Sequence, residues 1–247
     1  MKLFFCTNAE TKRTKNFLLM EKAIKSASIN TNFEIFLIYD GDKKELNFSS
    51  TINIIEHRHR LYDVFKNSNR DLTYASSTFL RTEIPYLCNK FNIKDKYILY
   101  TDYDVIFNKS DYSELETIKP DVLAASTEIQ KDNWNGFNAG VMILNTEYFI
   151  QEDSFILNYI KNNFDNLHIW DQTMYNNLYS SKFTRLPIMY NWKVYWGIER
   201  DAKIIHFHGP KPRSIKPRQS YTDPFVMELL NNNIDYYNYY DTIFEAI

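Results

Sequence analysis

Short apolar runs and longer amphipathic stretches alternate along the first part of the chain. Residues 3–7 and 33–39 are mostly apolar and predict two buried strands, while residues 15–28 carry apolar side chains on one face and predict a helix. A strand, a helix and a strand in this order predict a parallel sheet with a right-handed crossover. Ligands then gather at the carboxyl ends of the strands, where Thr7 and Asn8 lie.

The alternation continues through the rest of the chain. Further strands are expected at residues 52–56, 96–107, 121–126, 137–145 and 202–208. Helices are expected at residues 73–89 with a break near Pro85, at 154–164, from 170 onward and at 223–233. The pattern predicts a single α/β domain over residues 1–247, in which residues 210–247 form a basic loop and a helical tail.

The strand expected at residues 96–107 contains two carboxylates, Asp102 and Asp104, inside an otherwise apolar run. Side chains two residues apart in an extended segment point to the same side, with Cβ atoms ~6.6 Å apart. Burying both charges without a partner costs on the order of several kcal/mol each, so a divalent cation between them would explain their position. Two partly solvated aspartates just past a strand end are the alternative.

A second Asp-x-Asp sequence, from Asp40 to Asp42, follows another expected strand. Its Asp-Gly step is a strong turn signal, so this pair is interpreted as the chain leaving the sheet. The pair at Asp102 differs because the apolar residues 105–107 follow it. The choice between the two pairs depends on the rest of the chain.

Three other charged positions allow a structural as well as a functional interpretation. The alternating histidines and arginines at 57–60 favour a solvated loop over a ligand site. Arg81, on an expected helix, forms either a surface ion pair or an inward contact near the strand that carries Asp102. Asp171 fits the N-cap of the helix expected from residue 170, which would explain it without catalysis.

The last expected strand leads into a segment rich in proline and positive charge. Residues 209–218 contain three prolines and four cations, an extended basic loop that suits an anion or an acidic membrane surface. A solvated linker before the terminal helix is the alternative. His206 and His208 alternate on the strand, so we expect only one of them to face inward.

Composition and charge exclude several classes of function. The formal charge of −2, from 29 basic and 31 acidic residues, gives no case for a nucleic-acid partner. Only five glycines occur, and neither common glycine-rich phosphate loop is present, so bound phosphates would need other groups to neutralise them. An aromatic content of 17% suits either stacking on sugar or base rings or packing in the core.

Cysteine content and hydropathy bear on location. Two cysteines, Cys6 and Cys88, cannot form a disulfide framework, which favours a reducing compartment. The first apolar segment is too short for a signal sequence, and no run of ~18 apolar residues occurs. We therefore expect a cytoplasmic protein, either free or peripheral to a membrane.

Five short sequences become informative when they are taken together and in order. They are Tyr-Ile-Leu-Tyr-Thr-Asp-Tyr-Asp ending at Asp104, Phe-Asn-Ala-Gly-Val-Met-Ile-Leu-Asn at 137–145, Asp171-Gln172, Tyr190-Asn191 and His-Phe-His-Gly-Pro-Lys-Pro at 206–212. The ordered set resembles family 8 of the retaining glycosyltransferases, which includes glycogenin and bacterial lipopolysaccharide galactosyl- and glucosyltransferases. The resemblance covers most of the chain.

This resemblance implies a GT-A fold, Rossmann-like, with a mixed and mostly parallel sheet flanked by helices. It also implies transfer of a hexose from a UDP-sugar, UDP-glucose or UDP-galactose, to a glycan or glycolipid with the help of Mn²⁺, or of Mg²⁺ in its place. Carried over residue by residue, Asp102, Asp104 and His206 hold the metal, and Asp171 and Gln172 act on the reacting sugar. The donor contacts would come from Thr7, Asn8, Arg81, Asp102, Asn138, Ala139, Gly209 and Lys211.

The residues fit this chemistry, with one departure from the family pattern. An imidazole beside two carboxylates favours Mn²⁺ over Mg²⁺, and a bridging cation with Lys211 would stabilise the charge that develops on departing UDP. Gln172 is a poor nucleophile, which favours attack on the face that the leaving group vacates, with Gln172 and Asp171 steadying the cationic sugar. The departure is that Gly209 and Lys211 are one residue closer than usual, and Arg213 replaces a tryptophan.

Two alternatives belong to other functional classes. A catalytically inactive sugar-nucleotide-binding protein would have the same fold, although the acidic pair, His206 and Asp171-Gln172 argue against it. A sugar-nucleotide pyrophosphorylase would ordinarily carry a glycine-rich loop near the N-terminus, and this sequence has none there.

Overall fold

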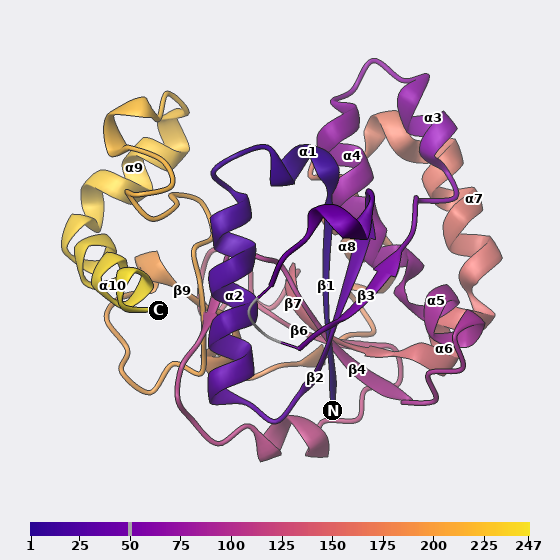
Figure 1. Ribbon diagram of the computed structural model, residues 1–247, viewed down its shortest axis with the longest axis horizontal. Helices are drawn as coiled ribbons and strands as arrows, with labels where there is room; N and C mark the ends of the chain where they lie inside the picture. The colour runs from indigo at the N-terminus through magenta and orange to yellow at the C-terminus, as the bar shows by residue number, and fades with distance from the viewer. Residues whose placement is uncertain (49–50) are drawn as a thin grey trace.

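A computed structural model describes residues 1–48 and 51–247, and in this part of the chain a seven-stranded sheet forms the centre (Figure 1). Its strands, in spatial order, are β3 (Asn53–Glu56), β2 (Glu34–Asp40), β1 (Lys2–Asn8), β4 (Tyr97–Thr101), β7 (Asn138–Asn145), β6 (Leu123–Ser126) and β8 (Thr184–Arg185). A smaller sheet contains β5 (Val105–Phe107), β10 (Ile204–His206) and β9 (Trp192–Lys193).

The large sheet is mixed and mostly parallel, as expected. β1 pairs in parallel with β2 and β4, and β2 pairs in parallel with β3. β7 is antiparallel to both of its neighbours, β4 and β6. Because β7 runs backwards between them, β4 and β6 point the same way and their carboxyl ends meet at one edge of the sheet.

Helices cover both faces of the sheet (Figure 1). They are α1 (Ala9–Lys12), α2 (Phe17–Asn30), α3 (Tyr62–Lys66), α4 (Leu72–Thr78), α5 (Ile84–Lys90), α6 (Thr146–Gln151), α7 (Asp153–Asn163), α8 (Trp170–Tyr179), α9 (Pro224–Asn232) and α10 (Ile234–Ala246). Successive β1 side chains enter opposite cores: Phe4 packs in the core that includes α4 to α8, and Phe5 in the core that includes α2. α9 and α10 pack in a third core with β9 and β10.

The strand expected at residues 96–107 is two strands in two different sheets. β4 ends at Thr101, and β5 begins at Val105 and pairs with β10. The chain bends at residues 102–104, so the expectation of one extended segment was wrong, although ligand atoms of the two aspartates still lie within 4.8 Å of each other. The apolar pattern continues across the bend because both strands are buried, and periodicity carries no sign of a change of sheet.

The helix expected at residues 73–89 is three helical pieces. α4 and α5 are separated by a 3₁₀ segment, Phe79–Glu83, that carries Arg81. Pro85 lies in the first turn of α5, where its missing N–H has no helical partner to lose. The break therefore comes before the proline, and it turns Arg81 inward, where only 6% of its surface is exposed.

The segment at residues 57–60 forms an ion-pair cluster with the buried Glu83, although Arg58 and Arg60 stay exposed, so its interpretation as a solvated loop holds only in part. The fully buried Glu83 receives hydrogen bonds from His57 Nε2 at 2.8 Å and Arg60 Nε at 2.8 Å. His59 is also buried, and desolvation lowers its pKa to about 4. The buried negative charge of Glu83 thus has hydrogen-bonded partners from this segment, as a buried charge requires.

The basic loop at residues 209–218 is docked on the C-terminal helices. Asp241 of α10 accepts hydrogen bonds from the Arg213 backbone N–H at 3.3 Å and from Arg218 at 2.8 Å. The Lys216 ammonium lies 4.5 Å from the centre of the Tyr221 ring. A freely solvated linker does not describe this loop.

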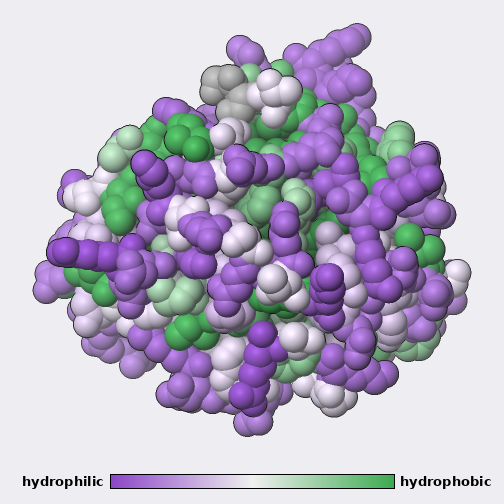
Figure 2. All heavy atoms as spheres, turned by 90° about the horizontal axis from the view of Figure 1, so that it is seen from below, coloured by the Kyte–Doolittle hydropathy of each residue, from purple (hydrophilic) through white to green (hydrophobic). Residues whose placement is uncertain are grey.

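Most aromatic rings pack in the cores, which is the structural one of the two uses expected for them. Within residues 1–48 and 51–247, the exposed aromatic side chains are Tyr74, Phe91, Phe155 and Phe225. Figure 2 shows one face of the molecule, on which hydrophilic side chains predominate and apolar ones form separate patches. None of the helices in the described residues has the length and apolar character needed to cross a bilayer.

Candidate functional site

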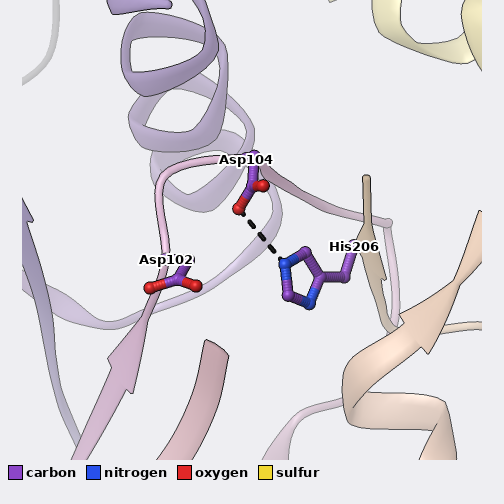
Figure 3. Close-up of side chains that lie close together, drawn as sticks. All are labelled: Asp102, Asp104 and His206. Atoms are coloured by element: carbon purple, nitrogen blue, oxygen red, sulfur yellow. Dashed lines mark ion pairs between the residues drawn. The ribbon is translucent and has the colours of Figure 1, made fainter. Parts of the chain in front are cut away.

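Asp102, Asp104 and His206 come together where the two sheets meet (Figure 3). Asp102 follows β4, Asp104 precedes β5, and the pairing of β5 with β10 sets His206 opposite Val105. The imidazole points at Asp104, with His206 Nε2 at 3.2 Å from the Asp104 Oδ1 (Figure 3). One ligand atom from each of the three side chains lies within 4.8 Å of the others, the geometry of a metal site.

Asp104 is held by two positively polarised neighbours. Its Oδ2 accepts a hydrogen bond from Lys211 Nζ at 2.5 Å, while Oδ1 faces His206. Burial disfavours the charge on Asp104, but Lys211 and His206 outweigh it and keep the pKa of this carboxyl well below its usual range. Asp104 is therefore ionised at neutral pH, as a metal ligand must be.

The hydrogen bonding of His206 leaves one ring nitrogen for a metal. Its Nδ1 bonds to Asn191 Oδ1 at 2.8 Å, and an amide oxygen can only accept, so Nδ1 carries the proton. Burial lowers the pKa of His206, which favours a neutral ring whose Nε2 lone pair faces Asp104. Two acceptors at 3.2 Å call for a cation between or beside them.

Gly140, on β7, forms the floor of this cluster. A Cβ on Gly140 would lie 2.4 Å from His206 Cε1, 2.9 Å from Asn138 Oδ1 and 3.0 Å from Asp102 Oδ2. Only glycine lets the β7 backbone approach the three side chains so closely. The two carboxylates, the free imidazole nitrogen and this glycine floor fit a divalent cation.

Arg81 joins the metal cluster to the helix α8. Its guanidinium lies 2.9 Å from Asp102 and 2.9 Å from Asp171, and it donates to the Ala139 carbonyl at 2.7 Å. Desolvation opposes the charge on Arg81, but the two carboxylates raise its pKa further above the ordinary value. Of the two interpretations of Arg81, the inward one is correct.

Asp171 does not cap α8, so the capping interpretation was wrong. The N-cap position is Ile169, and Asp171 lies in the first turn with 3% of its surface exposed. Burial raises the pKa of Asp171 to about 7, although Arg81 opposes the rise. Asp102 and Asp171 share the single guanidinium of Arg81, so burial of Asp171 is only partly compensated and its charged form is disfavoured.

Gln172 lies beside the start of β7. Its Oε1 accepts hydrogen bonds from the Ala139 backbone N–H at 2.9 Å and from Asn138 Nδ2 at 3.1 Å. Asn138 is buried, and its Oδ1 accepts from the Gly140 N–H at 3.1 Å. The sequence-predicted residues Asn138, Ala139, Asp171 and Gln172 are thus brought together with Arg81.

The basic loop returns Lys211 to the acidic pair. Gly209 has φ +82°, a left-handed conformation that favours glycine, and it turns the chain after β10. Lys211 Nζ then reaches Asp104 and the Phe207 carbonyl, the latter at 2.8 Å. The shortened Gly-Pro-Lys spacing therefore still brings the ammonium to the site.

A cavity of about 420 Å³ opens beside the acidic pair. Its lining includes the charged groups Arg81, Asp102, Asp104 and Lys211, together with residues of α1, α4 and their flanks that include Glu10, Thr11, Thr14, Asn16, Asp71, Thr73 and Tyr74. Thr7 and Asn8 are not in its lining. Asn8 is buried and bonds to Thr11 and Ser76, so it holds α1 and α4, two of the walls, in place.

Comparison with protein-family models decides the family. The model described as glycosyl transferase family 8 matches residues 11–213. This chain is a member of that family. Membership in a glycosyltransferase family favours glycosyl transfer over the pyrophosphorylase alternative. Comparison with curated proteins finds no match.

Solved structures share the GT-A fold of this family 8 protein. GlyE of Streptococcus pneumoniae has a TM-score of 0.66 at 18% identity, covering 94% of this chain and 62% of that one. The galactosyltransferase LgtC, in complex with donor and acceptor sugar analogues, has a TM-score of 0.66 at 16% identity. The match covers 94% of this chain and 96% of LgtC. Mouse xyloside xylosyltransferase 1 has a TM-score of 0.58 at 16% identity, and the match covers 85% of this chain and 98% of the mouse protein. The chain thus spans about 62% of the GlyE structure.

The other Asp-x-Asp pair of this family 8 chain is a turn, as interpreted from the sequence. Asp40 ends β2 and pairs with Arg58 at 3.1 Å. Asp42 is exposed and accepts the Lys44 backbone N–H at 2.9 Å. Neither belongs to a group of metal-ligating side chains within residues 1–48 and 51–247.

His208 lies on the same side as His206, so the expectation that only one faces inward was wrong. Their ring centres are 5.4 Å apart, because residues two apart along an extended chain share a side. His208 Nε2 pairs with Glu128 at 3.1 Å, and its Nδ1 lies 3.0 Å from Tyr195 Oη. Burial opposes the charge on Glu128, but the bond with His208 lowers its pKa to about 2.

Two polar residues of the site went unassigned in the sequence. Glu128 lies just beyond the carboxyl end of β6, and the rule that selected Thr7 and Asn8 would have selected it too. Asn191 was part of a recognised motif, but nothing in the sequence connected it with His206. Its role depends on a hydrogen bond between residues 15 positions apart.

Proposed function

We propose that this protein is a metal-dependent retaining glycosyltransferase that moves a hexose from a UDP-sugar to a hydroxyl group of a glycan or glycolipid. The observation that carries the proposal is the cluster of Asp102, Asp104 and His206, whose ligand atoms lie within 4.8 Å of one another and whose two aspartates line the cavity. Family membership supports glycosyl transfer. Arg81 and Lys211 in the cavity lining support a diphosphate-linked donor.

Asp102, Asp104 and His206 would hold Mn²⁺, with Mg²⁺ as the alternative. One nitrogen ligand beside two carboxylates favours the softer ion. The metal, when bound, would neutralise charge on the diphosphate as the glycosidic bond breaks. Lys211, paired with Asp104, supplies a second positive charge beside the metal ligands, and Gly209 sets its position.

An exposed aromatic ring in the cavity lining suits the nucleoside. Tyr74 is 60% exposed and lines the cavity, so its ring offers a stacking surface for the base. Tyr74→Ala should raise the KM for different UDP-sugars alike, because they have the base in common. An unchanged KM would remove Tyr74 from the donor site.

The residues around Arg81 suit the reacting sugar. Arg81 reaches the cavity and would contact the donor, with Asn138 and Ala139 shaping the adjoining backbone. Gln172 would steady the cationic sugar through its amide group during attack on the vacated face. Asp171 would act by holding Arg81, since its own carboxyl is buried in that ion pair.

The acceptor and the location remain part of this proposal. A glycan or glycolipid acceptor suits the family and the cytoplasmic location proposed for the chain. Lys216 is exposed on the docked basic loop, and Arg218 is partly exposed beside it. These two cations would favour an anionic acceptor or a peripheral contact with an acidic membrane surface.

Hydrolysis of UDP-sugars without acceptor tests the function and separates it from an inactive sugar-nucleotide-binding protein. Purified protein is incubated with UDP-glucose, UDP-galactose and other UDP-hexoses in Mn²⁺, Mg²⁺ or EDTA, and UDP release is measured. We expect release that depends on the metal and is fastest in Mn²⁺. Adding a panel of glycan acceptors and analysing products by mass spectrometry would identify the acceptor and the anomeric outcome.

A matched pair of variants controls this experiment. Asp104→Asn should abolish UDP release while the protein stays folded, because it removes a metal charge. Asp42→Asn changes the other acidic pair, at an exposed turn, and should be nearly silent. Activity that survives Asp104→Asn but is lost in Asp42→Asn would contradict the assigned metal site.

A further inference from the structure

Three amide side chains form a hydrogen-bonded chain from His206 to Gln172. Asn191 Oδ1 bonds to His206 Nδ1 at 2.8 Å, and Asn191 Nδ2 donates to Asn138 Oδ1 at 3.0 Å. Asn138 Nδ2 donates in turn to Gln172 Oε1 at 3.1 Å. Asn191, Asn138 and His206 are almost fully buried, so solvent does not compete for these bonds.

Backbone N–H groups set the orientation of the three amide side chains in this hydrogen-bonded series. The Gly140 N–H needs an acceptor at 3.1 Å, so the atom of Asn138 facing it is oxygen. Asn191 must then present its NH₂ to that oxygen, which turns its own oxygen toward His206. His206 can meet that oxygen only with an N–H on Nδ1, and this leaves Nε2 unprotonated on the side of Asp104.

The same direction holds at the other end of the chain. The Asn138 NH₂ and the Ala139 backbone N–H, at 2.9 Å, both donate to Gln172 Oε1. The NH₂ of Gln172 is therefore free to point elsewhere. One stretch of β7 backbone thus sets both the lone pair of His206 and the orientation of the Gln172 amide.

We propose that Asn191 is a positioning residue that holds His206 in its Nδ1–H form for metal binding and, through Asn138, holds Gln172 in its working orientation. The inference rests on the proposed function for the identity of the metal and of the reaction. The protonation pattern of His206 itself is a property of the protein alone. It can be measured without metal, donor or activity.

Nuclear magnetic resonance tests the first half of the proposal. In metal-free protein labelled with ¹⁵N at histidine, long-range couplings distinguish an Nδ1–H ring from an Nε2–H ring. His206→Gln identifies the His206 signal by its disappearance. We expect the Nδ1–H form in the wild type at pH 7.5, and the Nε2–H form would overturn the proposal.

Two substitutions at Asn191 separate positioning from general stability. Asn191→Leu removes both hydrogen bonds, and we expect Mn²⁺ affinity, measured by electron paramagnetic resonance of free Mn²⁺, to fall 10- to 100-fold. Asn191→Asp still accepts from His206 but cannot donate to Asn138 Oδ1, which forces Asn138 and Gln172 to reorient. We expect it to keep Mn²⁺ affinity within about threefold while kcat for UDP-sugar hydrolysis falls about tenfold.

Asn145 offers a matched control at the other end of β7. It is also buried, and its side chain bonds to the backbone of Asp121 at 2.8 Å. Asn145→Leu should lower thermal stability without changing Mn²⁺ affinity. Equal Mn²⁺ affinity in Asn191→Leu and wild type, or equal losses of affinity in Asn191→Leu and Asn191→Asp, would overturn the proposal.

These outcomes differ from failure of the proposed function. A wild-type protein that shows the Nδ1–H form but neither binds Mn²⁺ nor hydrolyses UDP-sugars would refute the proposed function. The hydrogen-bonded connection from Asn138 through Asn191 to His206 would stand. A wild-type protein that hydrolyses UDP-sugars but shows the Nε2–H form would refute only the proposed role of Asn191.

Discussion

Asp171→Asn should make the protein more stable at neutral pH and less active. Asp171 and Asp102 share Arg81, and the Asp171 side chain is 4% exposed where that of Asp102 is 28% exposed. Burial raises the pKa of Asp171 to about 7. Asparagine has the size of a protonated aspartate but never ionises, so the substitution removes the cost of burying the charge. Arg81 keeps Asp102 and the Ala139 carbonyl as partners.

The size of the effect follows from the two pKa values. An aspartate in an unfolded chain has a pKa of about 3.9. Between about pH 4 and pH 7 the folded state keeps a proton that the unfolded state has released, so wild-type stability falls as pH rises through this window, by about 1.4 kcal/mol per unit. The variant lacks this loss. Its advantage should be near zero at pH 4, about 1.5 kcal/mol at pH 5 and roughly 3 to 4 kcal/mol at pH 7.

Urea unfolding followed by tryptophan fluorescence, at pH 5, 6, 7 and 8, measures this difference for the two proteins. The advantage should rise with pH and level off above pH 7. An advantage that does not change with pH, or a variant less stable than wild type at pH 7, would show that native Asp171 has an ordinary pKa. Hydrolysis of a UDP-sugar by the same samples tests the loss of activity, which should accompany the gain in stability because Asp171 holds Arg81.

The remaining predictions concern the metal site and the basic loop. His206→Ala should weaken Mn²⁺ binding much more than His208→Ala, because only His206 faces Asp104; titration of both variants with Mn²⁺ measures this. Lys211→Ala should lower kcat and raise the donor KM together in steady-state kinetics, because a phosphate contact helps both the bound donor and the leaving group. Lys216→Ala with Arg218→Ala should slow transfer only to an anionic acceptor, and the effect should fade with added salt, which screens charge over ~8 Å at physiological strength.

Each of these has an outcome that would contradict it. Equal losses of Mn²⁺ affinity at positions 206 and 208 would mean that neither histidine is correctly assigned. Unchanged donor kinetics in Lys211→Ala, with hydrolysis impaired in the double variant, would move the phosphate contact downstream along the loop. A salt-independent effect of the double variant would point to the ion pair of Arg218 with Asp241 instead.

The sequence by itself determined the architecture and most of the site. Apolar runs of strand length separated by amphipathic helices require a sheet with buried faces, whatever the contacts in detail. The turn signal at Asp40 to Asp42 and the apolar residues after Asp104 distinguished the two acidic pairs, and the ordered motifs along the rest of the chain completed the choice. Such features depend on residues that are adjacent in the sequence, so they can be predicted without the tertiary structure.

Other features depended on which strand lies beside which. The bend at residues 102–104 sends β5 to a second sheet, and only that pairing brings His206 to Asp104. Residues 57–60 are as polar as a solvated loop, yet His59 is buried, and His57 and Arg60 pair with the buried Glu83. A pattern of hydrophobicity records burial only for apolar side chains, so it misses polar groups that are buried in pairs.

The finest feature of the site is set entirely by tertiary structure. The proton on His206 is placed by Asn191, whose amide is oriented by Asn138, whose amide is oriented by the Gly140 backbone N–H. Each residue is ordinary in its own stretch of sequence. Each hydrogen bond needs a donor on one partner and an acceptor on the other, so the orientation of one amide sets that of the next. This series forms only because the start of β7, the residues before β9 and the end of β10 meet in the fold.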